Sequence, residues 1–265
     1  MKLENQHNVK LVILAGGYGT RISEESYSKP KPMIEIGGKP IIWHIMKYYS
    51  AFGINNFIVC AGYKSHMIKE YFNNFFIHNN DVNFIINNNK VSSSQIKNIN
   101  WNVKVVDTGL TTMTGGRIKK IKKYLKNDDF FLMTYGDGLS NIDISKTIRS
   151  FKNNKKLALV SAVKEPSRFG IMQIKKNIVS SFNEKPDYNT NERINGGFFV
   201  LSTKVTNLIK DSKTKWEDSP LRQLTKSNNL LAHKHNGFWH PMDTLRDKIY
   251  LEKLWNENRA PWKIW

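Results

Sequence analysis

The order of apolar patterns along the chain is the feature that most constrains its fold. Short apolar runs, typical of buried strands, alternate with longer runs in which apolar residues recur at helical spacing. The pattern predicts strands over residues 9–14, 57–61, 82–87, 103–107, 130–135 and 157–163, and helices over 40–52, 65–75, 117–125 and 143–153. An alternation of this kind favours a mostly parallel sheet with helices on both faces. We therefore expect an α/β fold.

After residue 163 the pattern changes. Segments 169–174, 178–184 and 196–201 alternate like short antiparallel strands, with turn signals between them, and a helical run covers 244–255. We expect an N-terminal extension (1–8) followed by one domain (9–265). The domain is divided into a first half of about 9–150, a second, more antiparallel half of about 151–243, and a C-terminal helix and tail of 244–265. Residues 88–100 are expected to form a flexible surface insertion.

Charge and composition narrow the possible partners. The 265 residues include 41 Lys and Arg against 22 Asp and Glu, a formal charge of +19. Such an excess favours an anionic partner, unless it reflects compositional drift toward Lys and Asn. Because the basic residues are scattered, we expect no nucleic-acid surface. Residues 1–8 do not resemble a signal peptide and no apolar run is long enough to span a membrane, so we expect a cytoplasmic protein without a membrane partner. The single Cys60 excludes a disulfide framework.

The first predicted strand leads directly into a glycine-rich turn that ends at Arg21. A glycine turn at this end of a parallel strand suits nucleotide phosphates, because glycine lets backbone N–H groups approach them closely. Neither G-x-G-x-x-G nor the P-loop pattern fits. Arg21 and Lys31 would suit a polyphosphate, since Pro30 and Pro32 stiffen the segment around Lys31. The pattern alone is equally consistent with a surface turn that carries ordinary basic residues.

Two aspartates are candidate metal ligands. Asp137 follows the strand over 130–135 and lies between two glycines, and Asp243 precedes the last predicted helix. Mg²⁺ is usually held by one or two carboxylates together with substrate phosphates. The pattern alone also allows each aspartate to be a turn or helix-cap residue.

Several strings resemble a known family. LAGGYGTR followed by KPKPM resembles the signature of the sugar-1-phosphate nucleotidylyltransferases, and TGGRIKKI, TYGDGL and GFWHPMDTLRDKIYLEKLW are similar to its CTP-dependent branch. The resemblance covers nearly all of the chain from Lys10 onward. It implies a Rossmann-like fold with a smaller antiparallel sugar-binding region, a homo-oligomer, Mg²⁺ as cofactor, and CTP and α-D-glucose 1-phosphate as substrates. The products would be CDP-glucose, for deoxysugar and O-antigen synthesis, and pyrophosphate.

The resemblance also implies roles for individual residues. The implied metal ligands are Asp137 and Asp243, and the implied catalytic residues are Arg21, Lys31, Asp137 and Lys185. The implied nucleotide-binding residues are Leu14, Ala15, Gly16, Gly17, Gly19, Thr20, Arg21, Lys31, Thr112, Arg117 and Gly136. The implied sugar-phosphate-binding residues are Glu184, Lys185, Asn195, Gly196 and Gly197, with Arg168, Phe169 and Gly170 nearby.

Alternatives remain open at the level of sequence. A thymidylyl- or uridylyltransferase would use the same phosphate chemistry, and a non-catalytic nucleotide-binding protein could keep the same fold. His233 and His235 have no third metal ligand at a suitable spacing and are expected to be surface residues. The tryptophans near the C-terminus are expected to serve helix packing or a subunit contact: Trp239, Trp255, Trp262 and Trp265.

Overall fold

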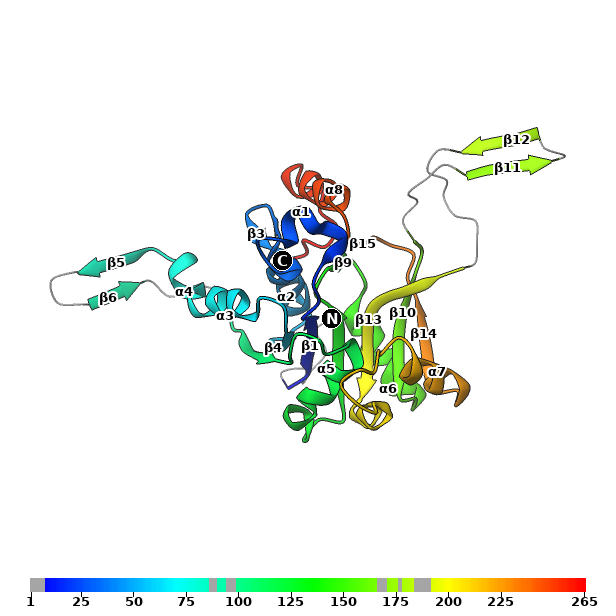
Figure 1. Cartoon of the computed structure of the whole chain (residues 1–265), viewed down its shortest axis with the longest axis horizontal. Coiled ribbons are helices and arrows are strands. Elements are labelled where there is room, and N and C mark those ends of the chain that lie inside the picture. The colour runs from blue at the N-terminus through cyan, green and yellow to red at the C-terminus, as the bar shows by residue number, and fades with distance from the viewer. Residues whose placement is uncertain (1–7, 86–89, 94–98, 166–170, 176–177, 184–191) are drawn as a thin grey trace.

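A computed structural model describes residues 8–85, 90–93, 99–165, 171–175, 178–183 and 192–265 (Figure 1). Its centre is a seven-stranded sheet in the order β14-β10-β13-β8-β1-β4-β7. The strands in this order are Leu230–Lys234, Ala158–Val163, Ile194–Ser202, Phe130–Tyr135, Lys10–Ala15, Asn56–Ala61 and Asn102–Asp107. β1 is parallel to both β4 and β8, and β4 is parallel to β7. The predicted α/β fold with a mostly parallel sheet is confirmed.

One strand of the main sheet, β13, is reversed. Residues 196–201 were expected to form an antiparallel strand, and β13 is antiparallel to both β8 and β10. All six of these residues are buried, as is typical of a central strand covered on both faces. A buried run of this kind does not indicate which strands it pairs with, so the pattern did not predict that β13 lies between β10 and β8.

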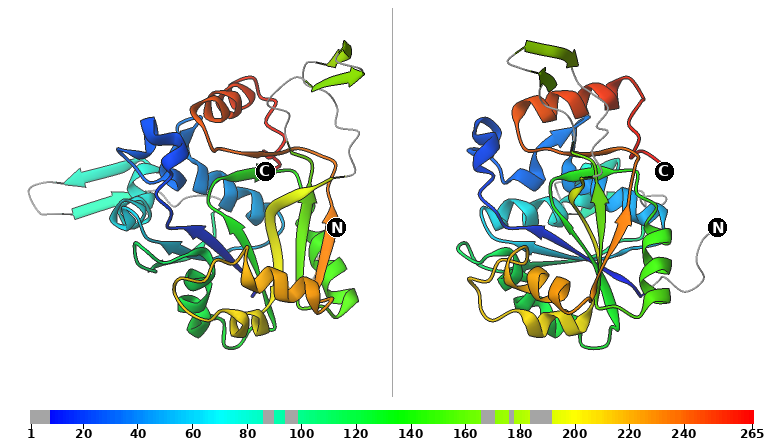
Figure 2. Two further views of the ribbon diagram at one scale, coloured as in Figure 1. Left: turned by 45° about the vertical axis from the view of Figure 1, so that its right-hand side comes forward. Right: turned by 90° about the vertical axis from the view of Figure 1, so that its right-hand side faces the viewer.

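Helices cover both faces of the sheet (Figure 2). Side chains of β1 alternate between two cores: Leu11 and Ile13 belong to one, and Val12 and Leu14 to the other. The first core includes residues of α2 (Ile41–Ala51) and α6 (Ile144–Asn154), and the second includes residues of α5 (Thr114–Ile121) and α7 (Ser219–Lys226). The remaining α-helices of the described residues are α1 (Ser23–Ser26), α3 (Ser65–Asn73), α4 (Phe75–His78) and α8 (Leu245–Asn256).

Two helices begin at side-chain caps. Asp143 is the N-cap of α6, where it accepts a hydrogen bond from the Lys146 backbone N–H at 2.9 Å. Thr244 and Asp247 form a reciprocal capping box at the start of α8. Helix α7 was not predicted in the sequence. No helix in the described ranges is long and apolar enough to cross a membrane.

Two hairpins project from the body of the molecule (Figure 1). One pairs β5 (Val82–Ile85) with β6 (Lys90–Ser93), and the other pairs β11 (Ile171–Lys175) with β12 (Ile178–Asn183). Residues 90–93 of the insertion predicted over 88–100 are thus paired with β5 in this projecting hairpin. The second hairpin matches the predicted antiparallel pair. Two shorter pairs are β2 (Glu35–Ile36) with β3 (Lys39–Pro40), and β9 (Gly138–Ser140) with β15 (Trp239–Pro241).

The C-terminal aromatic residues pack against α2. Trp262 is fully buried, and its indole N–H donates to His44 Nδ1 at 3.3 Å. Rings of Trp255 and Trp265 also contact His44. These contacts agree with the expected packing role. Trp239 is different, because its indole N–H donates to the Gly196 carbonyl at 2.7 Å, within the candidate site.

Candidate active site

The glycine loop lies directly after β1, at the carboxyl end of the parallel strands. Gly19 has φ +68°, in the left-handed region that favours glycine. A Cβ added at Gly16 would lie 2.1 Å from Arg117 Nη1, whereas one added at Gly17 would meet nothing within 4 Å. The sequence therefore needs glycine at Gly16 for a close approach and at Gly19 for the turn.

The Arg117 side chain binds the backbone of this loop. The side chain is only 4% exposed, although it comes from the first turn of α5. Its Nη2 donates to the Gly16 carbonyl at 2.9 Å. Its Nη1 lies within hydrogen-bond distance of the Ala61 carbonyl, the Thr108 hydroxyl and the Gly109 carbonyl. Burial lowers the pKa of the guanidinium. Arg117 therefore joins the loop to the ends of β4 and β7.

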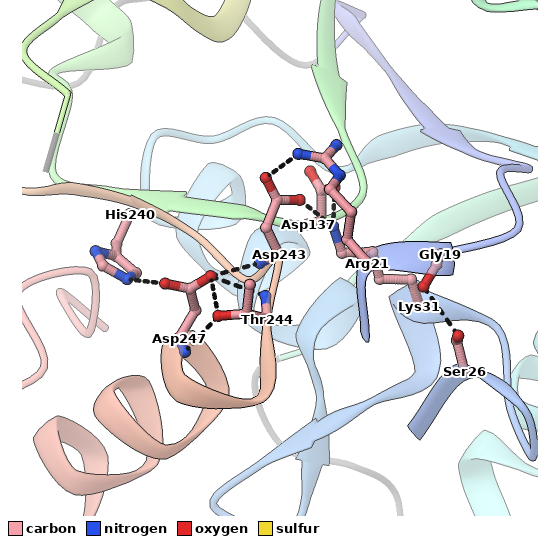
Figure 3. A network of polar contacts seen from close by, with 9 residues as sticks. All are labelled: Gly19, Arg21, Ser26, Lys31, Asp137, His240, Asp243, Thr244 and Asp247. Atoms are coloured by element: carbon pink, nitrogen blue, oxygen red, sulfur yellow. Dashed lines mark hydrogen bonds and ion pairs between the residues drawn. The ribbon is translucent and has the colours of Figure 1, made fainter. Parts of the chain in front are cut away.

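Two cations and two carboxylates meet beside the loop (Figure 3). Lys31 Nζ donates to Asp137 Oδ2 at 2.7 Å and to Asp243 Oδ1 at 2.5 Å. Arg21 Nη1 donates to the other oxygen of Asp243, also at 2.5 Å. Lys31 is 8% exposed, whereas the Arg21 side chain is 71% exposed. The ammonium of Lys31 is thus shared by two carboxylates, and Arg21 reaches toward solvent.

Backbone pairing brings these distant residues together. The Gly136 N–H donates to the Leu14 carbonyl at 3.0 Å, which places the turn after β8 against the end of β1. The Met242 N–H donates to the Asp137 carbonyl at 2.7 Å, next to the β9–β15 ladder. Asp137 and Asp243 therefore face one another although 106 positions separate them in the chain.

The Asp247 carboxylate holds the backbone at Asp243 in place (Figure 3). Asp247 Oδ2 accepts hydrogen bonds from the backbone N–H groups of Asp243 and Thr244, at 3.1 and 2.8 Å, and from the Thr244 hydroxyl at 2.8 Å. Its other oxygen lies 3.0 Å from His240 Nε2. Burial favours a higher pKa for Asp247, but the Thr244 hydrogen bonds and His240 outweigh it and lower the pKa. Asp247 therefore stays ionised and fixes the backbone that carries Asp243.

The residues present fit a hard divalent cation. Asp137 and Asp243 direct carboxylate oxygens at one positive charge, the Lys31 ammonium, within 2.7 Å. Mg²⁺ prefers such oxygen ligands and usually takes only one or two carboxylates, with phosphates and water completing the shell. Among the described residues no group of three or more His, Cys, Asp or Glu could hold a metal by itself. His233 and His235 are half-buried residues at and beyond β14 rather than members of such a group.

The glycine loop, Arg21, Lys31, Arg117 and the two candidate metal ligands border one cavity of about 780 Å³, a size typical of small-ligand sites. Every predicted nucleotide-binding residue lines it, as do Asp137, Asp243, Asn195 and Gly196. Gly197 lies just outside the lining, against the ring of Tyr135. Glu184, Lys185 and the segment 168–170 lie outside the described residues.

The cavity is also lined by Tyr135, Glu217 and Trp239, to which the sequence analysis assigned no site role. The Tyr135 hydroxyl donates to Glu217 Oε1 at 2.5 Å, and the Thr114 hydroxyl donates to Glu217 Oε2 at 2.6 Å. Tyr135 ends an apolar strand next to Asp137, a position that could have revealed it. Glu217 lies in a polar stretch without any motif, so no local signal was available.

A glycine loop at the end of a parallel strand, with paired cations and carboxylates beside it, is the arrangement expected of an enzyme that acts on phosphorylated substrates. Residues 10–244 match the model of the nucleotidyl transferase family, and the chain belongs to that family. It is 52% identical over 257 residues to the glucose-1-phosphate cytidylyltransferase of Salmonella typhimurium, with 97% of this chain and 100% of the relative covered. The enzyme of the same name from Salmonella typhi matches with the same identity and coverage. The resemblance noted in the sequence is confirmed.

The solved structures agree with the observed architecture. The crystal structure of HddC from Yersinia pseudotuberculosis superposes with a TM-score of 0.68 at 25% identity, and the match covers 93% of this chain and 99% of that one. The same protein complexed with GMP-PN gives a TM-score of 0.67. The mixed sheet with its flanking helices is thus the fold of the family.

Proposed function

We propose that this chain transfers the cytidylyl group of CTP to α-D-glucose 1-phosphate, giving CDP-glucose and pyrophosphate. The observation that carries the proposal is the convergence of Arg21, Lys31, Asp137 and Asp243 beside the glycine loop. The names of the relatives that are 52% identical support the choice of base and sugar. CDP-glucose made in this way would feed deoxysugar and O-antigen synthesis, and we propose that the chain acts as a homo-oligomer.

The proposed reaction is an in-line displacement at the α-phosphorus of CTP. A phosphate oxygen of glucose 1-phosphate forms the new bond to this phosphorus, and the bond to the oxygen that bridges to the β-phosphate breaks. Pyrophosphate leaves with that electron pair. Because two anions must meet, positioning and charge neutralisation account for most of the catalysis.

Each part of the cluster has a proposed role. The backbone N–H groups of the glycine loop hold phosphate oxygens, and Arg117 keeps the Gly16 carbonyl turned away from them. Arg21, which is mostly exposed, closes on the triphosphate, while Lys31 neutralises charge close to the carboxylates. Glu184 and Lys185 are proposed to hold the sugar and its phosphate, with Asn195, Gly196 and Gly197 beside the hexose.

The proposed cofactor is Mg²⁺, held by Asp137 and Asp243. When bound, it supplies positive charge to the triphosphate and the leaving pyrophosphate. Asp247 keeps Asp243 in place through the Asp243 backbone N–H. Residues of about 9–150 would bind the nucleotide and residues of about 151–243 the sugar phosphate.

Pyrophosphate release by the purified protein tests this proposal. With Mg²⁺, we expect turnover with CTP and α-D-glucose 1-phosphate, at least tenfold greater kcat/KM for CTP than for UTP, dTTP, GTP or ATP, and CDP-glucose as the product. Faster turnover with another nucleotide would reassign the base. No turnover with any pair of nucleotide and sugar phosphate would contradict the proposed activity.

A further inference from the structure

We infer that Glu217 binds a hydroxyl group of a substrate and thereby contributes to substrate selection. The inference rests on the proposed function and extends it to a residue outside the phosphate and metal machinery. Glu217 lines the same cavity as the glycine loop but comes from the segment that precedes α7.

The backbone beside Glu217 is held firmly. The preceding residue, Trp216, is fully buried, and its backbone N–H donates to the Thr114 hydroxyl at 2.9 Å. The Gly116 N–H donates to the Thr214 carbonyl at 3.1 Å, and a Cβ at Gly116 would lie 2.4 Å from the Ser212 carbonyl oxygen. The start of α5 is therefore packed directly against the segment that carries Glu217.

The carboxylate itself is oriented by two hydroxyl groups. Tyr135 donates to one oxygen at 2.5 Å and Thr114 donates to the other at 2.6 Å. Burial raises the pKa of Tyr135, and the Glu217 charge raises it further, so the phenol keeps its proton and remains a donor. A carboxylate offers about four acceptor sites. Each oxygen of Glu217 thus keeps acceptor capacity for a ligand.

The charge environment of Glu217 differs from that of the other two carboxylates in the cavity. Asp137 and Asp243 are paired with Lys31 and Arg21. Glu217 forms no ion pair within 4 Å with a Lys or Arg of the described chain, and hydroxyl groups are its partners instead. An uncompensated carboxylate repels phosphate groups, so it suits a part of the ligand that presents neutral donors.

Hydroxyl groups are the donors that both proposed substrates share. Thr114 belongs to the part of the cavity expected to hold the nucleotide, and Asn195 belongs to the part expected to hold the sugar. Asn195 Nδ2 lies 3.5 Å from the Tyr135 hydroxyl, so Glu217 lies between the two parts. The hydroxyl that donates to Glu217 comes from the ribose of the nucleotide or from the hexose, and binding of deoxy analogues distinguishes these sources.

The test compares Glu217→Gln with Asp218→Asn, a matched control whose carboxylate pairs with Arg222 and does not line the cavity. Dissociation constants are measured by calorimetry for CTP, 2′-deoxy-CTP and 3′-deoxy-CTP. The same measurement is made for glucose 1-phosphate and its monodeoxy analogues, with a non-hydrolysable CTP analogue present. A hydrogen bond to a charged acceptor corresponds to about tenfold or more in affinity.

We expect Glu217→Gln to bind one substrate about tenfold more weakly than the wild type, and to bind the corresponding deoxy analogue with nearly the wild-type affinity. The affinities of Asp218→Asn should equal those of the wild type. Loss confined to the CTP series identifies the ribose, and loss confined to the sugar series identifies the hexose. Glu217→Asp, which keeps the charge but is one methylene shorter, should lose the same discrimination. Wild-type affinities in both Glu217 variants, or equal losses for parent and deoxy compounds, would overturn the inference. Absence of turnover by the wild type would instead contradict the proposed function.

Discussion

At the scale of single residues, the site depends on side chains that hold other side chains in place. Lys31 keeps two carboxylates within hydrogen-bond distance of one ammonium, and Asp247 fixes the backbone of Asp243. The spacing of Arg21 and Lys31 predicts a polyphosphate role for Lys31, but it does not predict the pairing of Lys31 with two carboxylates. The role of Asp247 could not be predicted either, because an aspartate in the first turn of a helix is ordinarily read as a cap. Only the fold shows that Asp247 also holds the backbone of the candidate metal ligand Asp243.

Replacement of Asp247 tests this supporting role. The Asp247 carboxylate accepts hydrogen bonds from the backbone N–H groups of Asp243 and Thr244, and Asp247→Asn removes its negative charge. Because Asp243 would then be held less firmly, we expect about tenfold weaker binding of Mg²⁺ or Mn²⁺. Titration of Mn²⁺ followed by electron paramagnetic resonance measures this directly. Asp143→Asn, at the N-cap of α6, is the matched control and should leave metal affinity unchanged. Equal metal affinity in Asp247→Asn and the wild type would show that Asp247 is a helix cap alone.

At the scale of elements, the glycine loop and α5 form one unit through Arg117. The sequence predicts both the loop and the helix, and the resemblance assigns Arg117 to the nucleotide. The fold shows that its guanidinium is occupied by the backbone of the loop and of two neighbouring strands. These contacts involve residues up to 101 positions apart. A local pattern contains no information about them, which is why this role could not be predicted.

The two neighbouring glycines of the loop provide a direct comparison. Gly16→Ala would place a Cβ 2.1 Å from Arg117 Nη1, so the guanidinium must move from its hydrogen bonds. We expect a loss of about 1–3 kcal/mol in the free energy of unfolding. At Gly17 an added Cβ meets nothing within 4 Å, and Gly17→Ala should stay within about 0.5 kcal/mol of the wild type. Chemical denaturation measures both changes, and equal stabilities of the two variants would argue against the role given to Arg117.

The contact between α2 and the C-terminal tail should depend on pH. His44 is fully buried, and burial lowers its pKa to about 4 from 6.5. The unfolded chain therefore binds a proton at this residue before the folded chain does, and stability falls as the pH decreases from about 6.5 to 4. The shift in pKa corresponds to a loss of ~3 kcal/mol in the free energy of unfolding at the acidic end of this range.

The difference between wild type and His44→Gln isolates this contribution. In denaturation experiments from pH 8 to pH 4, we expect the wild type to lose more stability than the variant, with the difference developing below pH 6.5. Parallel curves for the two proteins across this range would show that His44 does not carry the effect.

At the scale of the whole molecule, the order of strands and helices was predictable, but the full set of residues that line the cavity was not. Strands such as Phe130–Tyr135 are local apolar runs, and their alternation with helices determines a mostly parallel sheet. The reversed strand β13 contains a buried run like those of its neighbours, so its place in the main sheet follows from topology alone. The cavity gathers residues from Leu14 to Asp243. Its motif-bearing members were recognisable in the sequence, whereas Glu217 became visible only through its contacts with Tyr135 and Thr114.

The central claim is that an oxygen of the sugar phosphate attacks the α-phosphorus of CTP at this site. Glucose 1-phosphate labelled with ¹⁸O in its non-bridging phosphate oxygens tests it, with the products followed by ³¹P nuclear magnetic resonance. All label is expected to remain in CDP-glucose, including the new bridging oxygen, and the released pyrophosphate should carry none. Folded Asp137→Asn should form neither product at a comparable rate. Label in the pyrophosphate would contradict attack at the α-phosphorus, and rapid turnover by Asp137→Asn would contradict the role of Asp137.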